Sequence, residues 1–264
     1  MSMRFGLLVI VASTGLLLAT LARASSQPFE GSGQQASEDS AAIPSDRIGR
    51  LSIIEGEVSF LAAGAENWGA AEPNRPVTAG DRLWADADGR CEIDIGSTAF
   101  RIASGTELDI VRLDDDWIQV GLPQGSISGR VDLLDADQDE EIDTPNAAIA
   151  IVDRGRYRVD VSPDGATTGI TVWSGRAEVT AAGSTFTVEA NQVSVIRGDD
   201  APTYDLTDAG SPDDFDRWSL ARDERGGRAG IARRYVSENT PGGSDLDGYG
   251  SWDQDPTYGP IWHP

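Results

Sequence analysis

The feature that most constrains the fold of this chain is a long alternation of apolar and polar residues from Thr144 to Val161. Apolar side chains occupy the odd positions and charged side chains the even ones, which is typical of a β-strand with one buried and one exposed face. Pro145 cannot donate a hydrogen bond to a neighbouring strand, so it is expected to close the loop before this strand. Gly155 predicts either a bulge or a break between two strands. Asp153 lies on the apolar side, so either the chain turns there or the carboxylate is buried and paired.

Short segments of the same kind fill residues 47 to 200, and tight turns rich in glycine, aspartate and asparagine separate them. The apolar residues change parity across Gly56, which predicts a bulge at that position. The segments from Trp117 to Leu122 and from Ser126 to Leu134 are predicted to be two strands, because a Pro-Gln-Gly sequence lies between them. No long helical periodicity interrupts the pattern. We therefore expect an all-β domain of short antiparallel strands, arranged as a solenoid-like coil, a sandwich or a barrel.

Two segments near the ends of this region echo each other. Gly56 to Gly64 and Gly175 to Gly183 both begin with glycine and both end in Ala-Ala-Gly. Each is followed by an extended segment and then by a turn, at Ala79 to Asp81 and at Ala190 to Gln192. Glycine and asparagine tolerate the left-handed backbone that such turns need. The repeated spacing predicts β-coils stacked on one another.

The region from residue 47 to residue 200 resembles a FecR-like domain. The resemblance depends on the order and spacing of several motifs: Gly56-Glu57-Val58, Ala79-Gly80-Asp81-Arg82-Leu83, Leu122 to Gly125, Thr144-Pro145-Asn146-Ala147, Gly155 to Val161, and Val172-Trp173-Ser174-Gly175. It implies an all-β, solenoid-like periplasmic module. In signalling members of that family, the module works with a cytoplasmic anti-sigma domain and a membrane helix, and it relays the state of an outer-membrane transporter.

Residues 1 to 24 are predicted to be a signal peptide. A short basic start precedes an apolar run from Phe5 to Leu21, and Ala22-Arg23-Ala24 has the small-x-small form of a signal-peptidase site. An uncleaved anchor is the alternative, because the apolar run is near the lower length limit for crossing a bilayer. Residues 25 to 46 are rich in Ser, Gln, Gly and Glu and predict a disordered spacer. We expect no cytoplasmic domain before the apolar run, so the regulator function of the family is not carried over.

Residues 201 to 264 are predicted to be a C-terminal extension with one short helix and an irregular tail. Ser211-Pro212-Asp213-Asp214 is typical of a helix start, with Ser211 as the cap, a proline at the first position and acids in the first turn. Gly226-Gly227 is expected to end the helix, which places it at about residues 211 to 225. The tail is rich in Trp, Tyr, Gly and Pro. It resembles the region after the FecR-like domain in a group of large exported bacterial proteins of unknown function.

The aromatic side chains of this tail are the candidate partner-binding residues: Tyr249, Trp252, Tyr258 and Trp262. Aromatic rings interleaved with glycine and proline can stack on sugars or bind peptides. The alternative is that they only pack the tail onto the β domain.

The charge of the chain limits its partners. Asp and Glu total 44 against 21 arginines, with no lysine, and the net charge is −23. Such a charge repels phosphate backbones, so we expect no nucleic-acid partner. Arg154, Arg156 and Arg158 form a ladder that could bind an anionic group, but the excess of acids favours pairing with carboxylates on a neighbouring strand.

The sequence contains no recognisable catalytic arrangement. Its one histidine, His263, is the penultimate residue, where rigid positioning by a third group is not expected. Its one cysteine, Cys91, lies on an apolar face and is predicted to be a buried, unreactive thiol. Asp135 to Asp143 spaces acids as calcium loops do, but it lacks the glycine and the bidentate glutamate of those loops, so a solvated loop is the alternative. We expect no enzyme activity, no cofactor and no metal site.

Together these features predict an exported envelope protein, periplasmic or secreted, of a Gram-negative bacterium. The leading hypothesis is a non-enzymatic, FecR-like binding or scaffolding module for an envelope protein or polysaccharide, with no stable membrane span once the leader is cleaved. A periplasmic signal-relay component related to the FecR regulators is the first alternative. A carbohydrate-active enzyme is the second, and it would need two carboxylates that converge in a cleft lined by aromatic residues.

Overall fold

The computed structural model describes residues 47–198, 202–228, 231–237, 240 and 242–264. The chain divides into two compact units, Met1–Ala42 and Ile43–Pro264, and every described residue belongs to the second. The predicted signal peptide and spacer therefore lie outside the described residues. No helix within the described ranges is long and apolar enough to cross a membrane.

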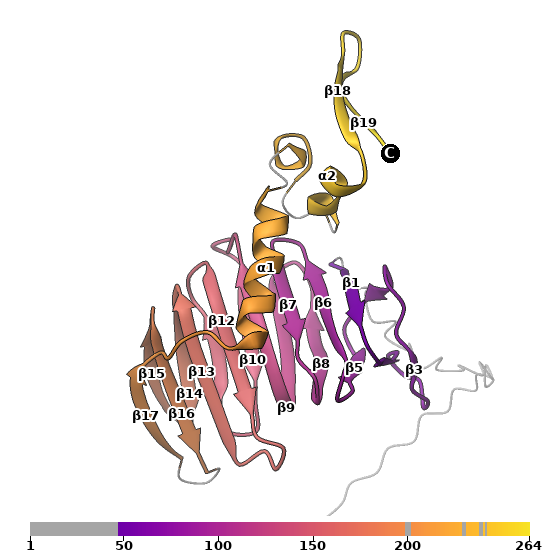
Figure 1. Ribbon diagram of the computed structural model, residues 1–264. Helices are drawn as coiled ribbons and strands as arrows, with labels where there is room; N and C mark the ends of the chain where they lie inside the picture. Colours follow the sequence, from indigo (N-terminus) through magenta and orange to yellow (C-terminus); the bar gives the residue numbers. More distant parts are fainter. Residues whose placement is uncertain (1–46, 199–201, 229–230, 238–239, 241) are drawn as a thin grey trace, which may run out of the picture. The chain divides into compact units, whose positions relative to one another are not determined.

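Strands dominate the second unit, as predicted, and they form two stacked layers (Figure 1). We call the first layer sheet A. Its strands follow one another in space as β4 (Pro76–Val77), β1 (Gly49–Glu55), β6 (Arg90–Ile95), β7 (Thr98–Ile102), the second half of β9 (Trp117–Val131), β12 (Gly155–Val161), β13 (Thr167–Ser174), β16 (Gln192–Arg197) and β17 (Thr203–Asp208).

We call the second layer sheet B. Its strands follow one another as β3 (Gly69–Ala70), β2 (Val58–Leu61), β5 (Arg82–Ala85), β8 (Thr106–Leu113), the first half of β9, β10 (Asp139–Asp143), β11 (Ala148–Ile151), β14 (Arg176–Ala181) and β15 (Ser184–Glu189). All strand pairings within the described residues are antiparallel except β9–β10, which is parallel. The all-β prediction is confirmed, and that parallel pair is the exception to its antiparallel order.

One strand joins the two layers. The segment from Trp117 to Leu122 pairs with β8 and β10 in sheet B, and the segment from Gly125 to Val131 pairs with β7 and β12 in sheet A. The prediction of two separate strands was therefore wrong. The chain can continue through this point because Gly125 adopts a φ of 96°, and a Cβ on it would lie 2.3 Å from the Thr106 hydroxyl oxygen.

The chain moves from one layer to the other at glycines that the sequence marked. Gly56 separates β1 in sheet A from β2 in sheet B, so the bulge predicted at Gly56 was wrong. The alternation around Thr144–Val161 is split in the same way: β11 lies in sheet B and β12 in sheet A, with Asp153 in the turn between them. The break predicted at Gly155 is confirmed. The echoing segments lie near opposite ends of sheet B, as β2 and β14.

The core fills the space between the layers. Alternate residues of most strands point inward, which gives patterns such as buried Tyr157, Val159 and Val161 on β12. Residues from both sheets meet in one cluster, including Leu51, Phe100, Ile110, Ile127 and Val179. Burial of this apolar surface is the main source of stability, at about 25 cal/mol per Å².

The C-terminal extension begins with α1 (Asp214–Arg228), and short elements follow it: η1 (Ala232–Arg234), η2 (Gly243–Asp245), α2 (Leu246–Tyr249), β18 (Ser251–Asp255) and β19 (Gly259–His263). The start of α1 differs from the prediction, because its cap is Asp213 and not Ser211. The backbone N–H of Asp216 donates to Asp213, and that of Asp213 donates to Asp216.

The end of α1 and the form of the tail also differ from the prediction. The helix continues through Gly226-Gly227 to Arg228, because glycine weakens a helix but keeps the N–H that proline lacks. The tail predicted to be irregular contains a β-hairpin, in which Trp252 lies opposite Trp262. Gly259 permits this turn with a φ of 81°.

Candidate functional site

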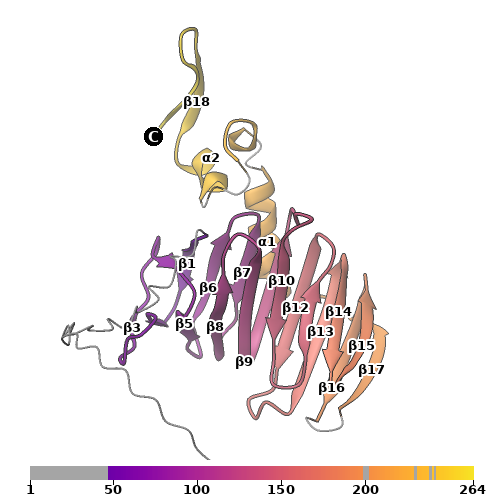
Figure 2. The same cartoon turned by 180° about the vertical axis from the view of Figure 1, so that it is seen from behind.

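Ionisable side chains gather on the outer face of sheet A, beneath and beside α1. In Figure 1 the helix lies across this face, and in the reverse view of Figure 2 it lies behind the strands. The side chains on this face alternate with core residues along each strand, so the period-two pattern that builds the core also builds the site. The residues concerned are Arg50, Glu92, Asp94, Arg101, Arg130, Arg156, Arg158 and Asp160.

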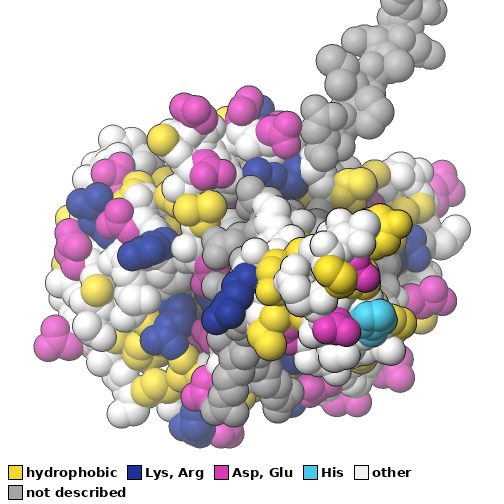
Figure 3. Space-filling model, turned by 90° about the horizontal axis from the view of Figure 1, so that it is seen from above, with side chains coloured by type: hydrophobic (Ala, Val, Ile, Leu, Met, Phe, Trp, Pro, Cys, Tyr) yellow, Lys and Arg dark blue, Asp and Glu magenta, His cyan; other side chains and the backbone are white. Residues whose placement is uncertain are grey.

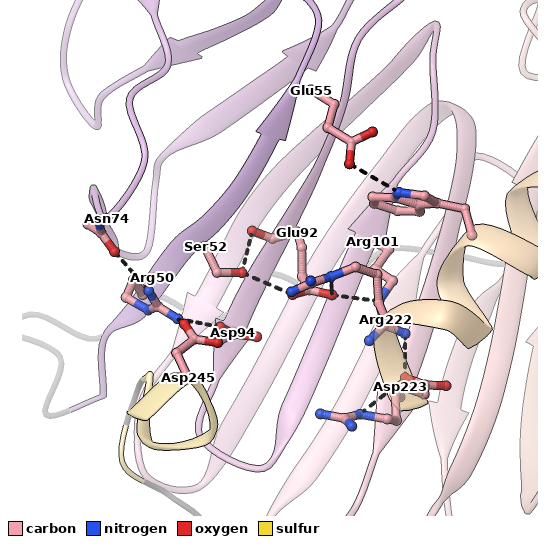
Figure 4. Close-up of polar contacts among 12 residues, drawn as sticks. Arg50, Ser52, Glu55, Asn74, Glu92, Asp94, Arg101, Arg222, Asp223 and Asp245 are labelled. Carbon is pink, nitrogen blue, oxygen red and sulfur yellow. Dashed lines mark hydrogen bonds and ion pairs between the residues drawn. The ribbon is translucent and has the colours of Figure 1, made fainter. Parts of the chain in front are cut away.

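Glu92 is at the centre of the first cluster (Figure 4). Its carboxylate lies 2.7 Å from Nε of Arg101 on the neighbouring strand and 2.8 Å from a terminal nitrogen of Arg222 on α1. Glu92 is 4% exposed and Arg101 is 2% exposed. Burial by itself would raise the pKa of Glu92, but the hydrogen bond from Arg222 and the charge of Arg101 outweigh it and lower the pKa to about 2. The carboxylate therefore stays charged and ties α1 to the sheet.

Asp223 extends this cluster along α1. One of its carboxylate oxygens lies 2.7 Å from a terminal nitrogen of Arg101 and 3.5 Å from Nε of Arg130. Arg101 thus contacts a carboxylate from the sheet and another from the helix. An arginine this deeply buried needs such partners, because its guanidinium cannot lose its charge.

Arg158 forms the second cluster, at the N-terminus of α1. It contacts Asp160 on its own strand at 2.9 Å, Asp213 at the cap of α1 at 2.6 Å and Asp216 in the first turn of α1 at 3.0 Å. Its guanidinium also lies over the ring of Phe215, 5.6 Å from the centroid. The two helix carboxylates that cap α1 are therefore the ones that bind it to the sheet. Burial raises the pKa of Asp216, and its close neighbour Asp213 adds to that effect.

A third cluster attaches the residues after α1. Arg50 on β1 contacts Asp94 at 3.0 Å, Asn74 at 2.8 Å and Asp245 on η2 (Figure 4). Trp218 adds an aromatic contact, because Arg90 lies over its ring at 4.5 Å and its indole N–H donates to Glu55 at 3.4 Å. The extension is thus bound to sheet A at the N-terminus of α1, along the middle of α1 and again at η2.

This arrangement attaches the extension to the sheet. Each carboxylate in the three clusters contacts an arginine, and most of these ion pairs join α1 or η2 to a strand of sheet A. Seen from above, Arg and Asp or Glu side chains are interspersed over this end of the molecule (Figure 3). Where the extension meets the sheet, the carboxylates are paired with arginines.

The arginine ladder predicted from the sequence divides into two parts. Arg158 pairs with its own strand and with α1, so the prediction of pairing with a neighbouring strand was wrong for it. Arg154 and Arg156 make no ion pair within the described residues. The sequence could not separate them, because α1 is about 55 residues away in the chain and covers only one of the three.

The acidic segment from Asp135 to Asp143 does not gather its carboxylates around one point. The pleat of β10 turns Glu140 inward and leaves Glu141 and Asp143 outside, where both accept hydrogen bonds from Gln119. Within the described residues, no group of three or more His, Cys, Asp or Glu side chains could hold a metal ion.

The remaining predicted residues are placed as follows. Cys91 is fully buried, as predicted, and burial raises the pKa of its thiol. His263 ends β19 and is exposed. Asp153 is exposed in its turn and lies 3.4 Å from Arg176, so it is not a buried carboxylate.

The four aromatic residues of the tail fall into two pairs. Trp252 and Trp262 face each other in the hairpin, and their indole N–H groups donate to Asp247 and to the carbonyl of Leu246, both at 3.0 Å. Trp252 also packs against Tyr235, with ring centroids 4.8 Å apart. Tyr249 and Tyr258 are instead 78% and 81% exposed. The tryptophans hold the tail together, and the tyrosines face outward.

The sequence did not single out Glu92, Arg101 or Glu140. Glu92 lies on the polar side of its strand, where a solvated carboxylate is the usual outcome. Arg101 carried a signal, because it lies inside a short apolar strand whose residues are all buried. An arginine in such a place predicts a buried counter-charge.

No family model matches this chain, and no curated protein matches it. Two crystal structures of a candidate anti-sigma factor from Parabacteroides distasonis ATCC 8503, at 2.50 and 1.65 Å resolution, are similar to it in structure. The sequence identities are 14% and 13%, and the TM-score is 0.43 in both cases. The similarity covers 48% of this chain and 59% of the other. At this identity and TM-score, it assigns neither a family nor a function to the chain.

Proposed function

We propose that this chain is a non-enzymatic, exported envelope protein, in which a FecR-like β-sandwich holds a C-terminal extension in place for contact with an envelope protein or polysaccharide. The observation that carries the proposal is the attachment of the extension to sheet A. Glu92, Arg158 and Arg50 each pair with a residue of the extension. A segment held at several points can present side chains at a defined place, which lowers the entropic cost of binding a partner.

The tyrosines of the tail supply the contact surface. Tyr249 lies at the end of α2 and Tyr258 in the turn between β18 and β19, and both are largely exposed while the adjacent tryptophans pack inward. Tyrosine gives a large contact area at low side-chain entropy cost, and its hydroxyl can bond a peptide or a sugar. The clusters on sheet A, by contrast, use their ionisable groups in internal ion pairs, which supports a binding role over a catalytic one.

Site-specific photo-crosslinking in cells tests the proposal. A photoreactive phenylalanine analogue replaces Tyr258 or Tyr249 in the full chain, and Val111 is the control position, because it is 49% exposed and lies on β8 in sheet B. We expect one defined envelope product from the two tyrosine positions and none from the control position. The same products from all three positions, or none from any, would contradict a binding role for the tail.

Two further measurements test the other parts of the proposal. The N-terminal residue of the mature protein, determined by mass spectrometry, is expected to be Ser25. An intact Met1 or Ser2 would favour a membrane anchor and with it a signal relay. Release of reducing sugar from envelope glycans by the purified chain would show that it is an enzyme.

A further inference from the structure

A groove lies on the outer face of sheet A, beside α1 and apart from the tail. It is an open hollow of about 570 Å³, within the size range of ligand sites. Arginines and carboxylates line it: Arg130, Arg154, Arg156, Asp132 and Asp223. We call it the arginine groove. A smaller cavity of about 130 Å³ adjoins it and shares Arg156 and Asp223 with it.

The groove brings arginines close together, although like charges repel. Arg130 on β9 and Arg156 on β12 are direct partners across two antiparallel strands, and like charges in that position repel. Arg154 lies in the turn that precedes β12, and it lines the same groove. Neither Arg154 nor Arg156 makes an ion pair in the part of the chain that the structure describes, although the sequence has more than twice as many acids as arginines.

The two carboxylates of the groove pair with Arg130 and not with Arg154 or Arg156. Asp223 is engaged with Arg101 at 2.7 Å, and its distance to Nε of Arg130 is 3.5 Å. Asp132 pairs with a terminal nitrogen of Arg130 at 3.5 Å. Nε of Arg130 is buried and lacks a hydrogen-bond partner within the described residues. The groove therefore has cationic donors to spare, which a bound anion would use.

The adjoining cavity indicates what the anion is attached to. Trp173 lies in its wall, together with the neutral hydrogen-bonding residues Ser128, Asn191 and Ser219 and with the carboxylates of Asp216 and Asp223. The hydroxyl of Ser219 is buried and without a partner in the described structure. An aromatic ring beside neutral polar groups suits a sugar ring, whose C–H face packs on the aromatic and whose hydroxyls bond the polar groups.

We propose that the arginine groove binds a carboxylate-bearing sugar. The carboxylate lies between Arg154 and Arg156, and the ring lies against Trp173. A planar carboxylate matches the paired N–H groups of a guanidinium. A single negative charge also suits the site better than a dianionic phosphate, because Asp132 and Asp223 are close by. The net charge of −23 further favours an isolated acidic sugar on a mostly neutral glycan over a dense polyanion.

Titration of the full chain with small probes tests this proposal. Glucuronate is the ligand probe, glucose removes the carboxylate, acetate removes the ring, and inorganic phosphate is the competing anion. We expect saturable binding of glucuronate in amide NMR spectra or by calorimetry, at least about tenfold tighter than binding of each other probe. Tighter binding of phosphate would make this an inorganic-anion site and would overturn the proposal. An absence of glucuronate binding up to about 50 mM would overturn it as well.

Variants locate the site. Arg156→Gln and Arg154→Gln are each expected to weaken glucuronate binding by about tenfold or more, and Trp173→Leu to remove its advantage over acetate. Arg197→Gln is the matched control, because Arg197 lies on the same sheet and pairs with Asp205 away from the groove. Equal weakening by Arg197→Gln would show a non-specific charge effect and overturn the site.

Arg154 is exposed in a turn, so its variant keeps the test valid where a strand variant fails to fold. The tyrosine positions of the tail are distinct from these residues. A negative result in either experiment therefore leaves the other result independent.

Discussion

Replacing Glu140 with glutamine is expected to change how the stability of this protein depends on pH. Glu140 points from β10 into the sandwich and is 1% exposed. One carboxyl oxygen accepts hydrogen bonds from Thr98 at 2.5 Å and from Gln138 at 2.9 Å. The other oxygen is buried without a partner in the described residues. Burial is the largest effect and raises the pKa of Glu140 to about 7, against the smaller opposing effect of the Thr98 hydrogen bond.

The sign of the pH effect follows from the raised pKa. Between pH 4.5 and about 7 the folded protein keeps the Glu140 proton and the unfolded chain has lost it, so the unfolding free energy falls as the pH rises. Raising a pKa from 4.5 to about 7 corresponds to about 3 kcal/mol. Because domains are stable by about 5–15 kcal/mol in total, this loss is large enough to measure.

Urea unfolding of the wild type and of Glu140→Gln at about pH 5 and about pH 8 measures the effect. Glutamine keeps the oxygen that accepts the two hydrogen bonds and never becomes charged. The variant is therefore expected to gain about 2.5 kcal/mol relative to the wild type between the two pH values, because the unfolded chain has already lost part of this proton at pH 5. Glu178→Gln on β14 is the control, because Glu178 is exposed. The same difference between Glu140→Gln and the wild type at both pH values would refute the reasoning.

Three further substitutions test the attachment of α1 and the strand crossovers. Glu92→Gln is expected to cost about 3 kcal/mol of unfolding free energy near neutral pH, because Arg101 and Arg222 lose a buried counter-charge. Because the pKa of Glu92 is about 2, the stability advantage of the wild type in urea titrations should disappear as the pH falls from 4.5 towards 2. A difference that stays constant with pH would contradict this. Gly175→Ala is expected to lower the unfolding free energy by about 2 kcal/mol more than Gly183→Ala does in thermal unfolding. The reason is that a Cβ at Gly175 would lie 2.1 Å from the Tyr157 hydroxyl, whereas a Cβ at Gly183 meets open space. Equal losses would argue against steric strain. Tyr157→Phe is expected to cost about 1 kcal/mol of unfolding free energy, because the Tyr157 hydroxyl donates to the Asp153 carbonyl and accepts from the Arg176 N–H at 3.2 Å. An unchanged urea midpoint would show that these hydrogen bonds add nothing to stability.

The ion pairs on sheet A join parts of the chain that are far apart in the sequence. The extension is attached through charges that lie 130 residues apart for Glu92 and Arg222, and 195 apart for Arg50 and Asp245. Ordering α1 on the sheet therefore closes long loops, and its cost is met only when the whole sandwich is folded. We expect α1 to be protected from hydrogen exchange only in the folded chain.

The sequence by itself determined the class of fold and most of the inward-facing residues. The alternation that buries Tyr157, Val159 and Val161 depends only on the two-residue period of a strand, so it can be read locally. The positions of many turns could also be predicted, because Gly175 and Asn191 adopt left-handed backbone conformations that other residues resist. The burial of Cys91 followed from the same alternation.

Only the tertiary structure decided which layer each strand joins and which charges meet. β11 and β12 look like one continuous pattern in the sequence, yet they belong to different sheets, whereas β9 is one strand that the sequence divides in two. The outer face of a strand carries polar residues whether water or a helix covers it, so the pattern could not show that Arg158 pairs with α1 while Arg156 stays open to a groove. The two-residue alternation of a strand and the residue preferences of a turn depend on residues that are neighbours in the sequence. The burial of a charge depends on segments that are distant in the chain.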